Sequence, residues 1–295
     1  MKVHLVNAFL EKTIISDRFF EGERPLYAIS NTVLDGVRFY PGESALKHTH
    51  DIAVRRCEFM GKYPFWHGDR LTISDCVFTV YARAAIWYSQ NILMRNTLVE
   101  APKMFRQVRY LTIENSRFPG AGETLWSCSD VTLKDVELKG ADYVFMNGRD
   151  IVVERMSLQG NYSFQDARNV EIRDSRLDSK DAFWGTENVT VYNSVIEGEF
   201  LGWHSKNLRL VNCTIRGLQP LCYATDLVME NCRMEDTNLC FEYSTLKADI
   251  DGDIGSVKNP KGGSIRARSI GQIVIDENCI DPGRCVIVTD KEKAV

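Results

Sequence analysis

A unit of 19 to 21 residues repeats twelve times along this 295-residue chain, and all five tryptophans occupy the same position in it. A period in this range is typical of a solenoid, because one such unit cannot bury its apolar face alone and must stack on its neighbours. Each tryptophan lies five residues before the next unit, so the sequence predicts one row of indoles along the rod. The units begin at Thr32, Ile52, Leu71, Ile92, Leu111, Val131, Ile151, Val170, Val189, Leu208, Leu227 and Leu246.

The pattern inside each unit predicts three short strands separated by three bends. Apolar residues at positions one and three, and again at six and eight, indicate strands with one buried face. A third apolar segment, in which Phe is the commonest core residue, precedes a closing Asp or Asn. No segment shows a sustained 3.6-residue period, so we expect an all-β parallel β-helix with three sheets and about 12 coils.

Position five of the unit is Asp or Asn in eight of the twelve units. These two side chains best tolerate the left-handed backbone conformation of a sharp corner, so the chain is expected to turn there. The eight predicted corner residues are Asp75, Asn96, Asn115, Asp135, Asp174, Asn193, Asn212 and Asn231.

Stacked coils of this kind resemble the single-stranded right-handed parallel β-helix superfamily, the pectin-lyase-like fold. The phrases at 130–140 (DVTLKDVELKG) and 207–217 (NLRLVNCTIRG) are similar to its typical coils. Within the superfamily, four further segments resemble a family of uncharacterised bacterial proteins. These are Phe183-Trp184, Gln219-Pro-Leu-Cys-Tyr223, Phe241-Glu242 and Ser256-Val-Lys-Asn-Pro260.

The ends of the repeat define the expected organisation of the chain. Residues 30–249 form the predicted β-helix, and residues 1–29 form an N-terminal cap, because an open coil exposes strand edges. The repeat fails after Asp249, so residues 250–295 are expected to form a C-terminal cap or an association segment.

Composition and the first residues indicate which binding partners and which cellular compartment to expect. A net charge of −4 and a pI near 5.8 provide no attraction for phosphate backbones or anionic lipid, so we expect neither nucleic acid nor membrane as a partner. The first residues do not form a signal peptide, which predicts a cytoplasmic protein.

Nine scattered cysteines fit that compartment as reduced, buried thiols. Cys57 with Cys76, and Cys213 with Cys232, are expected to be stacked neighbours. Disulfides remain the alternative, most of all for the pair at 279 and 285.

The tryptophan row is the first place to look for function. In the pectin-lyase-like superfamily the third strand of a coil commonly builds a polysaccharide groove, and aromatic faces suit sugar rings. Strand alternation exposes either this row or the Phe row, and charges such as Arg106 favour exposure of the tryptophans. His67 in the following row favours the opposite, and a bend between the two rows would expose both. The candidate substrate-binding residues are Trp66, Trp87, Trp126, Gln165, Trp184 and Trp203.

Four titratable residues on this side are candidates for catalysis. Asp166 and His204 are two coils apart, about 10 Å between backbones, and are candidates for a general acid and base. Arg106 is a candidate to bind a uronate carboxylate, and Glu242 completes the set. Each could equally be a solvated surface residue. Enzymes of this superfamily carry an Asp pair with an Arg-Ile-Lys segment or clusters of acidic residues, and this chain lacks both. Their absence weighs against activity of the polysaccharide lyase or glycoside hydrolase type, and the question of activity stays open.

Two patterns resemble metal sites without completing one. The segment at 249–253 (DIDGD) resembles the start of a calcium loop, but Pro260 stands where a bidentate Glu is needed. His48, His50 and His67 could ligate zinc, but chance alignment explains them better. We therefore expect no metal and no cofactor.

Two functions remain from the sequence. The first is a protein that binds, or binds and processes, an oligo- or polysaccharide along the tryptophan face. The second is a non-catalytic scaffold that forms a homo-oligomer through its aromatic row or its C-terminal segment, since an exposed hydrophobic stripe suits either.

Overall fold

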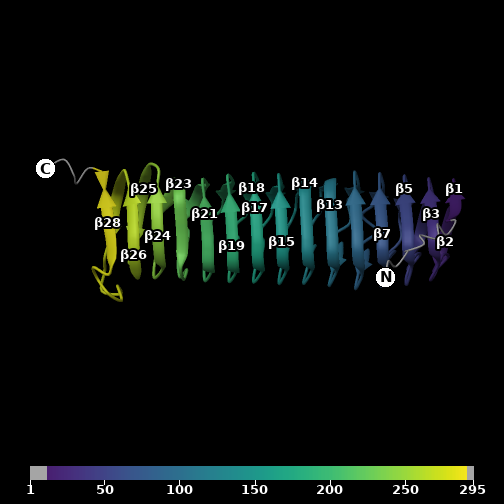
Figure 1. Cartoon of the computed structure of the whole chain (residues 1–295), viewed down its shortest axis with the longest axis horizontal. Coiled ribbons are helices and arrows are strands. Elements are labelled where there is room, and N and C mark those ends of the chain that lie inside the picture. The colour runs from purple at the N-terminus through teal and green to yellow at the C-terminus, as the bar shows by residue number, and fades with distance from the viewer. Residues whose placement is uncertain (1–11, 291–295) are drawn as a thin grey trace, which may run out of the picture.

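The computed structural model describes residues 12–290 as a rod of stacked coils, with β1 near one end and β28 at the other (Figure 1). All neighbouring strands of the coils pair in parallel, and 24 strands belong to one hydrogen-bonded network. The fold is therefore the all-β right-handed parallel β-helix that the repeat predicted. Across residues 12–290, no helix has the length and apolar character needed to cross a membrane.

Each coil begins with a strand on the first side of the rod, where the fifteen strands mark about 15 coils. They are β1 (Thr13–Ser16), β3 (Ser30–Asp35), β5 (His50–Arg55), β7 (Asp69–Ser74), β10 (Gln90–Arg95), β13 (Arg109–Phe118), β14 (Ser129–Leu138), β15 (Arg149–Glu154), β17 (Arg168–Arg173), β19 (Glu187–Tyr192), β21 (Lys206–Val211), β23 (Leu227–Asn238), β24 (Thr245–Ile250), β26 (Gly262–Ala267) and β28 (Cys285–Thr289).

The second side follows after a corner, and β13, β14 and β23 continue onto it. Its other strands are β2 (Phe19–Glu23), β4 (Arg38–Glu43), β6 (Glu58–Phe59), β8 (Val77–Phe78), β11 (Leu98–Val99), β16 (Ser157–Gln159), β18 (Arg176–Asp178), β20 (Val195–Glu197), β22 (Thr214–Leu218), β25 (Asp253–Lys258) and β27 (Ser269–Val274). The third side contains β9 (Ile86–Trp87) and β12 (Phe105–Arg106).

The solenoid is longer than the repeat indicated. The sequence predicted about twelve coils within residues 30–249, but β1 adds a coil by pairing with β3, and β26 and β28 add two more after β24. The predicted boundaries at 29/30 and 249/250 therefore do not interrupt the sheet. Backbone hydrogen bonds continue through coils whose side chains have lost the repeat pattern. Residues 1–11 of the predicted cap lie outside the described residues, and the association role of 250–295 stays a prediction.

All eight predicted corner residues adopt the left-handed conformation, with φ between 43° at Asn115 and 55° at Asp135. Their side chains also bond along the rod. The amide of Asn231 donates to Asn212 (2.8 Å), Asn212 to Asn193 (3.2 Å), and Asn193 to Asp174 (3.2 Å). The corner prediction is confirmed, and the ladder holds neighbouring corners in register.

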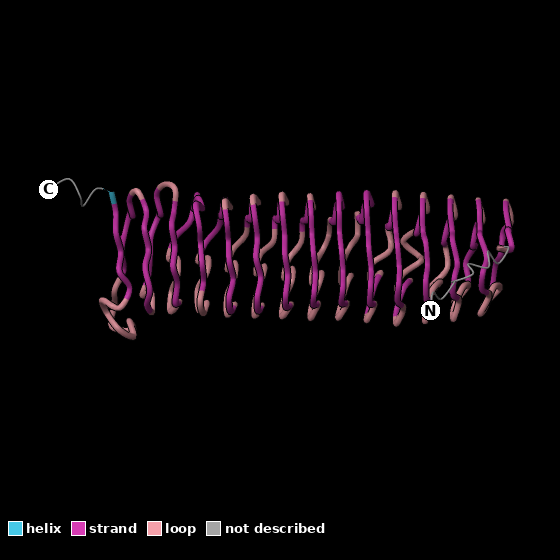
Figure 2. Tube along the Cα trace, in the orientation of Figure 1, coloured by secondary structure: helices cyan, strands magenta, loops and turns pink. Residues whose placement is uncertain are grey.

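The third side consists mostly of turns, which Figure 2 shows as pink segments that follow similar paths in successive coils. Alternate residues have positive φ there, as at Tyr162 (56°), Phe164 (61°) and Asp166 (55°). The Phe164 N–H donates to Val144 of the preceding coil, whereas the Asp166 N–H donates to Trp184 of the next coil. The third predicted sheet is thus a strand only in β9 and β12, because alternating left-handed residues break extended backbone.

Phenylalanine rings stack in columns inside the rod. The ring centroids of Phe39 and Phe59 are 5.0 Å apart, those of Phe59 and Phe78 are 4.6 Å apart, and those of Phe145 and Phe164 are 4.3 Å apart. All five rings are buried. Burial of such side chains stabilises the fold by about 1.5–3 kcal/mol each.

All nine cysteines are free thiols, and seven of them are buried. Cys57 and Cys76 are stacked neighbours, with the Cys57 N–H donating to the Cys76 sulfur (3.4 Å), as the repeat predicted. Burial raises the pKa of Cys128 to about 12 and that of Cys285 to about 11. The thiolate is the reactive form, so both thiols are poorly reactive near neutral pH.

Thiol modification tests this arrangement. With an excess of an aromatic disulfide reagent at pH 8, we expect one fast phase from half-exposed Cys279, a slow phase from Cys285, and seven further thiols only after denaturation. Cys279→Ser is expected to remove the fast phase alone. Rapid labelling of Cys57 or Cys213 in the native protein would contradict the packing.

Candidate functional site

The tryptophan row faces outward. All five indoles are half-buried, whereas the residue before each of them is buried in the core. The row after the tryptophans also reaches solvent, because residues such as His48 (φ 60°), His67 (φ 56°) and His204 (φ 57°) take the left-handed conformation. A bend thus exposes both rows, which was one of the alternatives that the sequence left open.

Stacking and hydrogen bonds between neighbouring coils hold the indoles in place. Trp66 and Trp87 stack with centroids 5.3 Å apart and planes 8° apart, and Trp184 and Trp203 stack at 5.5 Å and 30°. Four indole N–H groups donate to a carbonyl of the next coil at 2.5–2.8 Å, which leaves them no donor for a ligand. The pairs are Trp66 with Ala84, Trp87 with Lys103, Trp126 with Tyr143, and Trp203 with Gln219.

Arg106 lies between two indoles. Its guanidinium carbon is 4.3 Å from the ring centroid of Trp87 and 4.6 Å from that of Trp126. One of its nitrogens is 3.7 Å from a carboxylate oxygen of Glu123, while its buried Nε has no hydrogen-bond partner. Arg106, predicted to bind a uronate carboxylate, is therefore part of a cation–π ladder whose ring faces are already covered.

The outer row contains two columns of aromatic rings. The first includes His48 and His67, stacked with centroids 4.8 Å apart, and burial together with the nearby charges of His48 and Lys47 lowers the pKa of His67. The second column is His204, Tyr223 and Tyr243, with centroids 5.0 and 5.5 Å apart.

The row has no side chain at Gly185, between Asp166 and His204. A Cβ built on Gly185 (φ 65°) would lie 2.4 Å from Oδ1 of Asp166, so the Asp166 carboxylate extends over this glycine. His204 follows in the next coil, with its ring 5.3 Å from that of Trp184. The predicted pair Asp166 and His204 therefore lie on either side of this gap in the row of side chains, which we call the notch.

Trp184 lies beside this notch, and it differs from the other four tryptophans. Among residues 12–290 its indole nitrogen has no hydrogen-bond partner, so this donor remains free. The Trp184 ring lies 5.3 Å from that of His204. Gln165, also half-buried, is the preceding member of the tryptophan row.

A cavity of about 580 Å³ opens along the second column, and all three of its rings line the cavity. This volume lies within the range of small-molecule sites. Polar groups line it beside the rings, and no ion pair to Lys261 occurs within residues 12–290. The cavity is lined by His204, Tyr223, Thr225, Tyr243, Lys261, Asn278 and Ile280.

The repeat places Glu242 in the outer row, but in the structure it does not belong to that row. Strands β22 and β23 slip by one residue between Arg216 and Gly217, so Phe241 takes the buried core position predicted for Cys240, and Glu242 moves into the tryptophan row. Its carboxylate pairs with Lys258 at 2.9 Å and raises the pKa of that lysine. Glu242 is thus committed to an ion pair.

The slip explains which residues the sequence missed. Tyr243 occupies the outer-row position one residue later than predicted, and its N–H donates to Asn259 of the next coil as its row neighbours do. Lys261 and Asn278 lie beyond the repeat, where no periodicity assigns them to a row.

The two metal-like patterns form other contacts. His50 pairs with Asp51 (3.0 Å) on the first side, away from the His48–His67 stack. In the 249–253 segment, Asp251 pairs with Arg233 at 3.0 Å. Across the described residues, no group of three or more His, Cys, Asp or Glu side chains is placed to hold a metal ion.

The cation–π ladder predicts a stability effect without a ligand. Arg106→Ala is expected to lower the free energy of unfolding by about 1–3 kcal/mol, because two desolvated ring contacts are lost. Arg149→Ala, an exposed arginine on β15, is expected to change it by less than about 0.5 kcal/mol. Urea denaturation measures both, and equal stability of the two variants would rule out the ladder.

Comparison with known proteins identifies structures of similar fold and the family of this chain. Solved structures with a similar fold include PfbA, a surface adhesin of Streptococcus pneumoniae (9% identity, 90% of this chain and 85% of that chain covered, TM-score 0.45). Another is the mannuronan C-5 epimerase AlgE4 A-module of Azotobacter vinelandii (8% identity, 94% of this chain and 91% of that chain covered, TM-score 0.34). A third is a tailspike protein mutant of E. coli bacteriophage HK620 in complex with a hexasaccharide (9% identity, 96% of this chain and 72% of that chain covered, TM-score 0.34). These likenesses concern the fold alone. No curated protein matches the sequence. A family model matches residues 13–288, and the chain belongs to that family, described as Protein of unknown function (DUF3737).

Proposed function

We propose that the protein binds a saccharide at the second aromatic column, between the notch at Gly185 and the cavity beside Tyr243. The observation that carries the proposal is the cavity of about 580 Å³ along the stacked rings, with Lys261 at its wall. A column of rings has free faces only at its two ends. Here those ends are His204, next to Gly185, and Tyr243, and both line the cavity together with Tyr223.

The chemistry of the lining suits a sugar. The C–H face of a sugar ring packs on an aromatic face, while its hydroxyls need hydrogen-bonding neighbours. Thr225 and Asn278 offer such neighbours in the cavity. The unpaired ammonium of Lys261 would bind the carboxylate of a uronate, the role first considered for Arg106.

The tryptophan row is assigned mainly to the scaffold. Trp87 has both faces covered, by Trp66 and by Arg106, and Arg106 also covers one face of Trp126. The N–H groups of all three indoles are bonded to backbone. Trp184, with its free donor, is the member of the row that we place at the saccharide site. The row as a whole therefore stabilises the rod more than it binds ligand.

Asp166 and His204 are the pair that could process the bound saccharide. Both are exposed and flank the same notch, where a carboxylate and an imidazole would act as general base and general acid on a ring bound beside them. Arg106 and Glu242 are left out of this role because each has an ion-pair partner. A cytoplasmic location is part of the proposal.

Self-association is the second candidate, favoured by exposed apolar residues at the C-terminal end. Ile280 is 60% exposed and Val286, on the last strand of the rod, is 58% exposed. Such residues on an edge strand are suited to pairing with a second copy.

Titration with an oligosaccharide panel of neutral hexose, hexuronate and amino-sugar chains tests the saccharide proposal. Calorimetry and tryptophan fluorescence are expected to detect binding, with hexuronates the tightest. Lys261→Gln is expected to weaken hexuronate binding about ten- to hundredfold and to spare neutral chains, because only the charged hydrogen bond is lost. Lys134→Gln, on the first side, is the control. No response to any chain, together with a mass that rises with protein concentration, would favour self-association instead.

Processing is tested on the chain that binds best. Asp166→Asn is expected to leave its affinity within about threefold, whereas His204→Gln also removes a ring of the column and is expected to weaken it. At saturating ligand, each variant is expected to lower the rate of new reducing ends or unsaturated products by at least about a hundredfold. Unchanged rates in both variants would restrict the site to binding. Asp142→Asn serves as an exposed carboxylate control on the same side.

A further inference from the structure

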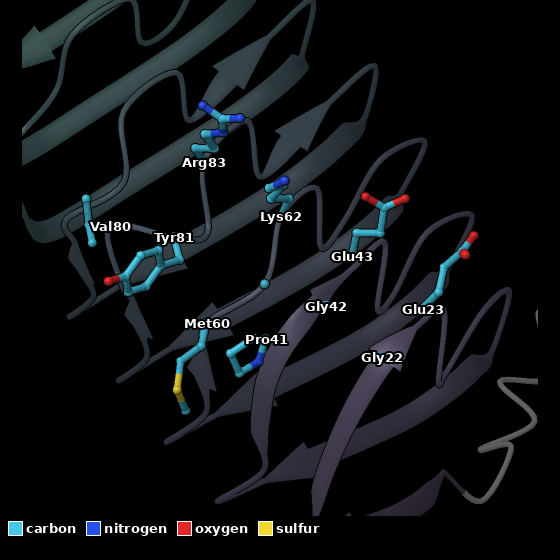
Figure 3. Close-up of a pocket in the computed structure, with 11 residues that line it drawn as sticks. Gly22, Glu23, Pro41, Gly42, Glu43, Met60, Lys62, Val80, Tyr81 and Arg83 are labelled. Carbon is cyan, nitrogen blue, oxygen red and sulfur yellow. The ribbon is translucent and has the colours of Figure 1, made fainter.

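A second cavity lies near the N-terminal end of the rod, at the bend that follows the second side (Figure 3). Its volume is about 700 Å³, and strands β2 and β4 lead into it. It lies far along the sequence from the aromatic column proposed above and shares no residue with it. It is therefore an independent site.

The floor of this cavity is bare backbone. Gly22, Gly42 and Gly61 follow one another in successive coils. A Cβ on Gly42 would lie 2.0 Å from the carbonyl oxygen of Gly22, and a Cβ on Gly61 would lie 2.6 Å from that of Gly42. No side chain fits at Gly42 or Gly61, so a ligand can approach the main chain closely.

One wall is built by an insertion. The unit that begins at Leu71 has 21 residues, more than any other, and the chain turns outward at Val80 and Tyr81, which are 54% and 69% exposed. Within residues 12–290 the N–H groups of these two residues donate no hydrogen bond. Insertions in a repeat often form the binding face, and exposed apolar tips are a feature of such faces. Met60 and Pro41 continue the apolar wall.

Charged side chains form the opposite rim. Figure 3 shows Glu23, Glu43, Lys62 and Arg83 in a row on one side of the glycines, with Pro41, Met60 and Tyr81 on the other. The acidic residues occupy the first two coils and the basic residues the next two. Across residues 12–290, Glu43, Lys62 and Arg83 make no ion pair, so their charges are available to a ligand.

We infer that this cavity binds a short peptide with free ends. Its amino end would lie at Glu43, its carboxylate at Lys62 and Arg83, and an apolar side chain against Met60 and Tyr81. Glu43 and Arg83 are two coils apart, about 10 Å along the rod, and an extended tripeptide spans about 10 Å. A carbonyl of its backbone could accept from the free N–H groups at the insertion.

The tripeptide Leu-Leu-Leu, its N-acetylated form and its C-amidated form are the probes, titrated by calorimetry against the full chain. We expect the free tripeptide to bind, and each blocked form to bind at least about tenfold more weakly, since each loses one charged contact. Equal affinity of the three forms, or no heat with any of them, would overturn the inference.

Variants separate the two ends of the peptide. Lys62→Gln combined with Arg83→Gln is expected to weaken the free tripeptide at least about tenfold and to abolish its advantage over the amidated form. Tyr81→Ser is expected to weaken all three forms alike, and Lys134→Gln is the surface-charge control. Thermal melting checks that each variant is folded; unchanged tripeptide binding in the folded double variant would also overturn the inference.

Discussion

Each coil must turn the chain several times within about twenty residues, and the left-handed corner is the constraint on which the rest of the rod depends. At the first corner the backbone takes φ near 50°, a conformation that Asn and Asp accept at low cost. Their side chains then bond from coil to coil, as in the series from Asn231 through Asn212 to Asn193. These ladders help to hold the coils that carry them in register, and a constant register turns each position of the repeat into a row along the rod.

Rows stabilise the rod and also limit what it can bind. A ring stacked on both faces, such as Trp87 between Trp66 and Arg106, contributes to stability and has no face left for a ligand. Binding is therefore expected where a row ends or is interrupted. Gly185, the end of the aromatic column at Tyr243, and the 21-residue unit with its turn at Val80 are three such places. In this protein the irregularities of the repeat carry more functional information than the repeat.

Charged side chains can be divided in the same way, into those that have a partner within the protein and those that do not. Residue type alone made Arg106 and Glu242 plausible ligand-binding groups, but one is covered by indoles and the other is paired with Lys258. Lys261, Lys62 and Arg83 are free of ion pairs within the described residues and line cavities instead. A charged side chain without a partner in the protein can bind a ligand directly. A paired charge must first break its ion pair, which costs free energy.

The sequence by itself determined the period and the corners, because each depends on spacing within about twenty residues and is repeated many times, whereas only the structure showed that the Phe row is the buried one. It also indicated that Asp166 and His204 share a face, since their positions in the repeat are equivalent. Tertiary structure alone decided the partner of each side chain, the one-residue slip that brought Tyr243 into the outer row, the coils beyond residues 30–249, and the meeting of Lys261 with Asn278 at one cavity. These depend on contacts between coils and on backbone pairing outside the repeat, and no local pattern in the sequence encodes them.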